Sequence, residues 1–200
     1  MKSLKLFSIA LLLLLVASSL PAVAGVVNMQ FTGTPTNNNY QGVPSYPYSF
    51  TVNGSPESLM CISFTEHIIG GETWQATEMT VADYGALIGL EKAQKVADLF
   101  GLAFADGGAD SAINAEAWWV MEGQPTPEPD GAVMAGFSFD PNKPYAGIRV
   151  FVPIPGTESW QGELPQTFLG PTPTPEPSTL LTLGAGLLGL AGLARKRLSS

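Results

Sequence analysis

The chain contains one cysteine and one histidine, Cys61 and His67, six positions apart. A thiol beside an imidazole can serve as a nucleophile, because the imidazole removes the proton and the thiolate then attacks. Glu66 could orient the ring. An extended chain would place the two groups roughly 20 Å apart unless residues 65–67 fold back, and no glycine-flanked turn surrounds the thiol. We therefore expect no enzyme, and a cysteine hydrolase is the most distant of the functions considered.

A single cysteine cannot form a disulfide within the chain, so Cys61 is free, paired with another molecule or chemically masked. Acidic side chains offer a second candidate chemistry, a calcium site at Asp106 and Asp110. That segment lacks the alternating ligands and the closing glutamate of an EF-hand loop. We predict no metal site and no cofactor.

Tryptophans could provide a platform on which sugar rings stack. The chain has four of them: Trp74, Trp118, Trp119 and Trp160. Large aromatic side chains are more often buried in a core, and Trp118 falls on the apolar face of an expected helix. Trp119 and Trp160 are the two that we expect to be exposed. Carbohydrate binding is therefore one alternative function.

The elements around these residues follow from the alternation of apolar and polar positions, which predicts strands. The expected strands cover residues 27–31, 48–52, 59–64, 72–79, 132–139 and 146–154. Asn53-Gly54 favours a tight hairpin turn, whereas residues 33–47 are expected to form a loop. Within residues 59–64, Met60, Ile62 and Phe64 share one face, and the odd-numbered residues, which include Cys61, share the other.

The pattern changes to helical spacing after Thr80, which forms a capping box with Asp83. Apolar residues three and four apart then mark a buried stripe: Leu90, Ala93, Val96, Ala97, Phe100 and Phe104. A second helix is expected over residues 109–121, followed by an exposed proline-rich loop over residues 124–131. Because strands flank the helical pair, the predicted class is α+β, a β-rich domain of hairpins, a small sheet or a barrel with a two-helix insertion.

The N-terminal residues read as a secretory signal peptide. Two lysines precede a long apolar run, and Ala22 and Ala24 supply the small residues of a cleavage site. We assign residues 1–24 to the signal peptide and residues 25–164 to an exported globular domain. This assignment predicts transport by the Sec translocon and cleavage by signal peptidase.

The C-terminal part of the chain reads as three consecutive segments. Residues 165–177 form a Pro/Thr-rich stalk that ends in Pro175, Glu176 and Pro177. Residues 178–194 carry no charge and predict a single transmembrane helix. Residues 195–200 form a basic cytoplasmic tail with the cluster Arg195, Lys196 and Arg197. The chain would contact a membrane only through these last segments, before processing.

A Pro-Glu-Pro tripeptide, an apolar segment and a terminal basic cluster resemble the PEP-CTERM sorting signal of exported proteins in many Gram-negative bacteria. The resemblance covers residue 175 to the end of the chain. It implies that an exosortase, a membrane processing enzyme, recognises the tripeptide, cleaves near it and releases the protein to the cell surface or the exopolysaccharide matrix. The same tripeptide at residues 127–129 is followed by Asp130-Gly131, so the tripeptide alone is no signal.

The order of elements over residues 48–121 also resembles the thioester domains of bacterial surface adhesins. In those domains a cysteine on a strand is linked to a glutamine at the start of a helix. Cys61 matches the cysteine, and Asn114, four residues before Trp118, lies where the glutamine would be. Because asparagine is one methylene shorter, a cross-link here would need a ring of a different size.

Charge excludes further classes of partner. Between residues 25 and 174, four basic residues stand against sixteen acidic ones, a net charge of −12. Such a surface repels nucleic acid and anionic membranes. The predicted function is that of a non-enzymatic protein, anchored in the inner membrane as a precursor and found at the cell surface or in the exopolysaccharide matrix when mature, with exopolysaccharide as a candidate partner. The alternative is a surface adhesin that carries a thioester or binds carbohydrate.

Overall fold

The structured part of the chain consists of strands that close into a barrel and helices that cover it. The barrel strands are β1 (Gly25–Gly33), β4 (Tyr48–Val52), β5 (Ser55–Cys61), β6 (Thr73–Thr80), β7 (Ile148–Pro153) and β8 (Phe168–Pro171). The helices are α2 (Val81–Ile88), α3 (Leu90–Ala105) and α4 (Ser111–Glu122). A small separate hairpin, β2 (Asn39–Tyr40) and β3 (Val43–Pro44), lies within the stretch expected as a loop.

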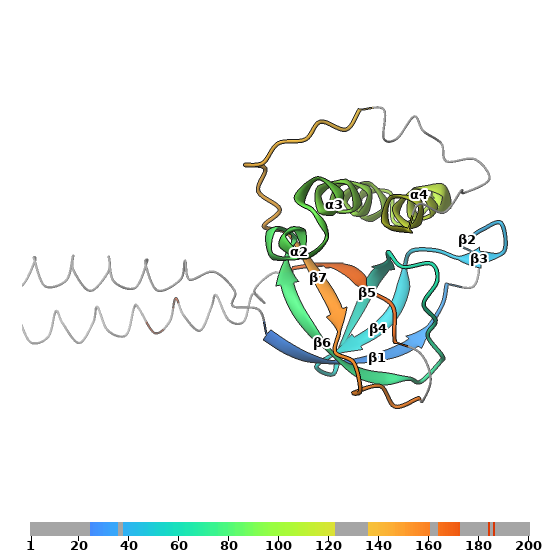
Figure 1. Ribbon diagram of the computed structural model, residues 1–200. Helices are drawn as coiled ribbons and strands as arrows, with labels where there is room; N and C mark the ends of the chain where they lie inside the picture. Colours follow the sequence, from blue (N-terminus) through green and yellow to red (C-terminus); the bar gives the residue numbers. More distant parts are fainter. Residues whose placement is uncertain are drawn as a thin grey trace, which may run out of the picture.

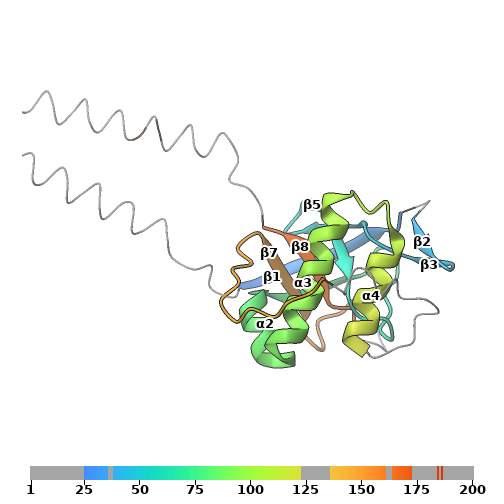
Figure 2. The same cartoon turned by 90° about the horizontal axis from the view of Figure 1, so that it is seen from above.

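The barrel is antiparallel, in the order β1-β4-β5-β8-β7-β6, and the helices lie together along one side of it (Figure 1). This computed structural model describes residues 25–35, 38–122, 136–160 and 164–172, together with Gly184 and Gly186. Seen from above, α3 and α4 lie across the barrel (Figure 2). The predicted α+β class is confirmed. Of the expected β arrangements, which were hairpins, a small sheet or a barrel, the structure has the barrel.

The β4–β5 hairpin confirms the predicted turn. Asn53 and Gly54 adopt positive φ angles of 50° and 83°, which a tight two-residue turn requires. The turn leads directly into the ladder, with Val52 opposite Ser55. The second strand of the hairpin therefore begins at Ser55, earlier than the sequence pattern indicated.

The predicted faces of β5 are also confirmed. Cys61 and its odd-numbered neighbour Leu59 belong to the core inside the barrel, whereas Met60 and Ile62 belong to the core between barrel and helices. The strand ends at Cys61, so Phe64 is not part of it and is 41% exposed.

The helical region has three helices, not the predicted pair. The Thr80 hydroxyl accepts a hydrogen bond from the Asp83 N–H at 3.1 Å, so the predicted N-cap of α2 is confirmed. The Asp83 carboxylate accepts from the Thr80 hydroxyl at 2.7 Å, where a capping box would have it accept from the Thr80 N–H. Gly89 then adopts a φ of 97°, a conformation that only glycine takes readily, and this breaks the expected single helix into α2 and α3. A Cβ at Gly85 would lie 2.8 Å from the Leu90 side chain, so glycine also permits the sharp bend.

The expected boundary at residue 164 is corrected by β8. The prediction placed residues 165–177 in an extended stalk, but Phe168 and Leu169 are completely buried, one inside the barrel and one beneath the helices. Their strand pairs with β5 on one side and β7 on the other, and so closes the barrel. The domain therefore extends to Pro171. Burial of two large apolar side chains stabilises the folded chain, whereas an extended stalk would leave them in water.

One predicted strand is not found where the structure can test it. Residues 136–139 form no strand. Residues 132–135, the other half of that prediction, and the proline-rich loop over residues 124–131 lie outside the described residues.

Candidate functional site

Cys61 lies at the end of β5 with its side chain inside the barrel. It is 1% exposed, and its Sγ donates a hydrogen bond to the Ser63 carbonyl oxygen at 2.9 Å. Burial raises the pKa of the thiol far above its usual range, because a thiolate would lose its hydration there. The thiol is therefore protonated at neutral pH, whereas a nucleophilic cysteine needs a lowered pKa.

The structure brings His67 to the same cavity as Cys61. Both line a cavity of about 290 Å³ at one end of the barrel, because β5 stops at Cys61 and residues 65–67 fold back. Among the described residues, however, no hydrogen bond joins the thiol to the imidazole. Besides burial, the carboxylates of Glu66 and Glu122 further raise the pKa of the thiol. The pair thus lacks the geometry and the charge of a cysteine nucleophile.

Asn114, at the start of α4, is brought directly to Cys61. Its Nδ2 donates to the Cys61 carbonyl oxygen at 2.6 Å, and its Oδ1 accepts from the Tyr46 N–H at 2.7 Å. Trp118 adds a second donor, its Nε1 lying 3.1 Å from the same Cys61 carbonyl. The side chain therefore joins three segments by hydrogen bonds, and its amide faces the backbone of Cys61. We call this arrangement the Asn114 clamp.

The opposite end of the barrel holds a charged cluster that the sequence analysis missed. Arg149 is 7% exposed, and its guanidinium contacts Glu57 at 2.5 Å and Glu78 at 3.2 Å. It also donates through Nε to the Pro171 carbonyl oxygen at 2.9 Å and lies 4.9 Å from the centre of the Phe151 ring. We call Arg149, Glu57 and Glu78 the barrel-end cluster; it closes the interior with satisfied polar groups.

Strand alternation could have indicated the barrel-end cluster. Arg149 and Glu57 each precede an inward-facing barrel residue by two positions, Phe151 and Leu59 respectively, and so share its face. Burial raises the pKa of the Glu57 carboxyl, and this outweighs the lowering effect of Arg149.

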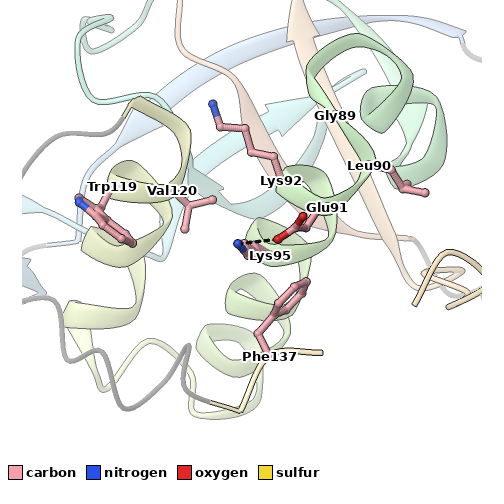
Figure 3. Close-up of a pocket in the computed structure, with 8 residues that line it drawn as sticks. All are labelled: Gly89, Leu90, Glu91, Lys92, Lys95, Trp119, Val120 and Phe137. Carbon is pink, nitrogen blue, oxygen red and sulfur yellow. Dashed lines mark ion pairs between the residues drawn. The ribbon is translucent and has the colours of Figure 1, made fainter. Parts of the chain in front are cut away.

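A groove between α3 and α4 combines an exposed tryptophan with partly exposed aromatic and basic side chains (Figure 3). Its volume is about 860 Å³. Lys92 and Lys95 come from α3, Trp119 from α4 and Phe137 from the segment before β7. Lys95 Nζ lies 2.9 Å from Glu91 Oε1 and 5.3 Å from the centre of the Phe137 ring. We call this feature the α3–α4 groove.

The tryptophans divide as predicted. Trp74 and Trp118 are 2% and 3% exposed and belong to the barrel core, whereas Trp119 and Trp160 are 43% and 52% exposed. Trp119 lines a groove that also holds basic side chains. The sequence indicated its exposure but not the composition of the groove, because Lys92 and Lys95 line it from another helix.

The acidic segment after α3 forms a local hydrogen-bonded turn. Asp106 accepts from the backbone N–H groups of Gly108 and Asp110, at 2.7 and 3.1 Å. Within the described ranges, no group of three or more His, Cys, Asp or Glu side chains is arranged to hold a metal ion.

The predicted terminal sites lie outside the described residues. These are the signal-cleavage residues Ala22 and Ala24, the tripeptide Pro175, Glu176 and Pro177, and the basic cluster Arg195, Lys196 and Arg197. Of the helices that the structure does describe, none has the length and apolar character needed to cross a membrane.

Fold and site together define a small α+β barrel protein whose interior is filled by apolar side chains and closed at one end by ion pairs. Comparison with known families identifies a sorting signal: residues 173–197 match the PEP-CTERM protein-sorting motif. The C-terminus thus carries the predicted sorting motif, which implies an exported, exosortase-processed protein made as a membrane-anchored precursor. No curated protein and no solved structure matches the chain, and the resemblance to thioester domains is not supported.

Proposed function

We propose that this chain is a non-enzymatic protein of the cell surface or the exopolysaccharide matrix, delivered there by exosortase processing. The sorting motif over residues 173–197 is the observation that carries the proposal. The exosortase route supports a final location outside the cell, where the domain would meet surface polymers. A protein in that position can act by binding or by occupying space.

The chemistry of the barrel supports a non-enzymatic role. The only thiol is buried and protonated, and the interior is occupied by apolar side chains. The buried guanidinium of Arg149 is bound to two carboxylates and a carbonyl oxygen. These groups are engaged in holding the fold, so none is available to react with a substrate.

The chain offers a matched control for testing the sorting step. Residues 125–129 have the same sequence as residues 173–177, Pro-Thr-Pro-Glu-Pro, but no apolar segment follows them. Replacing Pro175, Glu176 and Pro177 by alanine should leave the protein at full length in the inner-membrane fraction of the native cell. The same replacement at residues 127–129 should be processed like the wild type. Normal release of the first variant would contradict the proposal.

The α3–α4 groove favours one second function, a surface adhesin that binds carbohydrate. Trp119 is exposed there beside basic side chains. Its indole does not pack in the core and is therefore open to stacking against a sugar ring. The thioester form of this alternative has no such support, because the Asn114 amide donates to the Cys61 backbone carbonyl.

A further inference from the structure

The α3–α4 groove presents an aromatic face that the fold does not use. The five residues of α4 that directly precede Trp119, Asn114 to Trp118, are buried, whereas the Trp119 indole is 43% exposed. Figure 3 shows Trp119 and Val120 on one wall of the groove and the α3 side chains on the other. An exposed indole beside a hollow can stack on a ligand that has a flat apolar face.

The same groove gathers basic side chains in an acidic protein. Lys92 and Lys95 are two of only four basic residues between positions 25 and 174. The other two are engaged elsewhere: Lys143 contacts Asp98 at 2.7 Å, and Arg149 is buried in the barrel-end cluster. The groove is therefore the place on the described domain where a negatively charged ligand is best received.

Both groove lysines retain hydrogen-bonding capacity. Lys92 Nζ donates to the Met121 carbonyl oxygen at 2.6 Å, and Lys95 Nζ contacts Glu91. An ammonium has three donors, so each lysine can also bind a ligand oxygen. The Glu91 side chain is 60% exposed, and exposed ion pairs of this kind are weak, so a ligand carboxylate can compete with it.

We propose that the α3–α4 groove binds a carboxylate-bearing sugar, such as a uronic acid unit of an acidic polysaccharide. The C–H face of the pyranose stacks on Trp119, and its carboxylate lies between the ammonium groups of Lys92 and Lys95. This inference deepens the proposed function, which supplies the surface location where such a polymer would be met. Binding itself does not depend on sorting, so the two proposals can fail separately.

The test is calorimetric titration of the purified full chain, in a detergent without a sugar headgroup, with tetragalacturonate. Its fully methyl-esterified form has the same rings and no charge. We expect tetragalacturonate to bind, the ester to bind about tenfold more weakly, and affinity for the acid to fall between about 20 mM and about 500 mM salt. Failure to bind at millimolar concentration, or equal binding of acid and ester, would overturn the proposal.

Substitutions then locate the site. Trp119→Ala and Lys95→Met should each weaken binding of tetragalacturonate about tenfold, the loss expected for one stacked ring or one charged contact. The matched controls are Trp160→Ala and Lys143→Met, which alter an exposed tryptophan and an exposed lysine outside the groove and should change affinity less than about twofold. All four positions are partly exposed, so the variants should fold, which circular dichroism checks. Controls that lose as much affinity as the groove variants would refute the site.

Discussion

The Asn114 clamp should be a main support of the domain, and Asn114→Ala tests this. The side chain is 1% exposed and makes two hydrogen bonds to backbone groups of other segments. Alanine keeps the helix, because its helix propensity is higher than that of asparagine. Any loss of stability therefore comes from the clamp and not from α4 itself.

The magnitude follows from the two bonds. The Tyr46 N–H would stay buried without its acceptor, which costs about 1–3 kcal/mol. The bond to the Cys61 carbonyl is worth about 0.5–1.5 kcal/mol and is partly replaced, because Trp118 still donates to the same oxygen. We expect a total loss of about 2–4 kcal/mol in the free energy of unfolding. For a chain of this size the loss corresponds to a fall in Tm of about 4–16 °C.

Urea unfolding followed by tryptophan fluorescence measures the loss, since Trp74 and Trp118 pass from the core into water. The control is Asn142→Ala, which removes an exposed asparagine side chain from a turn and should change stability by less than about 0.5 kcal/mol. If Asn114→Ala is as stable as Asn142→Ala, the clamp does not support the fold and the reasoning is refuted.

Three further predictions follow from the structure. Arg149→Met should lower the free energy of unfolding by about 3 kcal/mol, because it leaves the half-buried carboxyl groups of Glu57 and Glu78 without their partner. Lys143→Met removes an exposed pair and should cost less than about 1 kcal/mol. Equal losses in the urea titration would contradict the barrel-end cluster. Cys61 should react with a thiol reagent only after unfolding, and a reactive thiol in the folded protein would argue against the burial. Because burial raises its folded-state pKa, stability should fall as pH rises from about 8.5 to about 10, the range in which the unfolded thiol ionises before the tyrosines do. Cys61→Ala should remove the dependence in this range. Gly101→Ala should stabilise α3 by up to about 1 kcal/mol, since no atom lies within 4 Å of the added Cβ; a lower Tm than the wild type would show that the helix is more crowded there.

Local patterns were enough to predict the parts of the fold that local chemistry determines. The hairpin turn at Asn53-Gly54 and the helix N-cap at Thr80 depend on residues that are close in the sequence, and both are observed. The two faces of β5 follow from alternation, but only the structure shows that the face with Cys61 lies inside the barrel. The expected exposure of Trp119 and Trp160 is also observed.

Features that depend on distant partners could not be predicted in the same way. The strand β8 looks like part of a proline-rich stalk, and only its pairing with β5 and β7 makes burial of Phe168 and Leu169 favourable. The break at Gly89 lies in a stretch whose apolar spacing fits one continuous helix. Contact between Asn114 and Cys61 was expected from the resemblance to thioester domains, but the hydrogen bond to a backbone carbonyl was not.

The most direct test of the account is intact mass and terminal sequencing of the protein recovered from the surface of its native cell. We expect a chain that begins at Gly25 and has lost Arg195, Lys196 and Arg197, with no mass deficit of one ammonia in the domain. A full-length chain embedded in the inner membrane would contradict the sorting on which the proposed function depends.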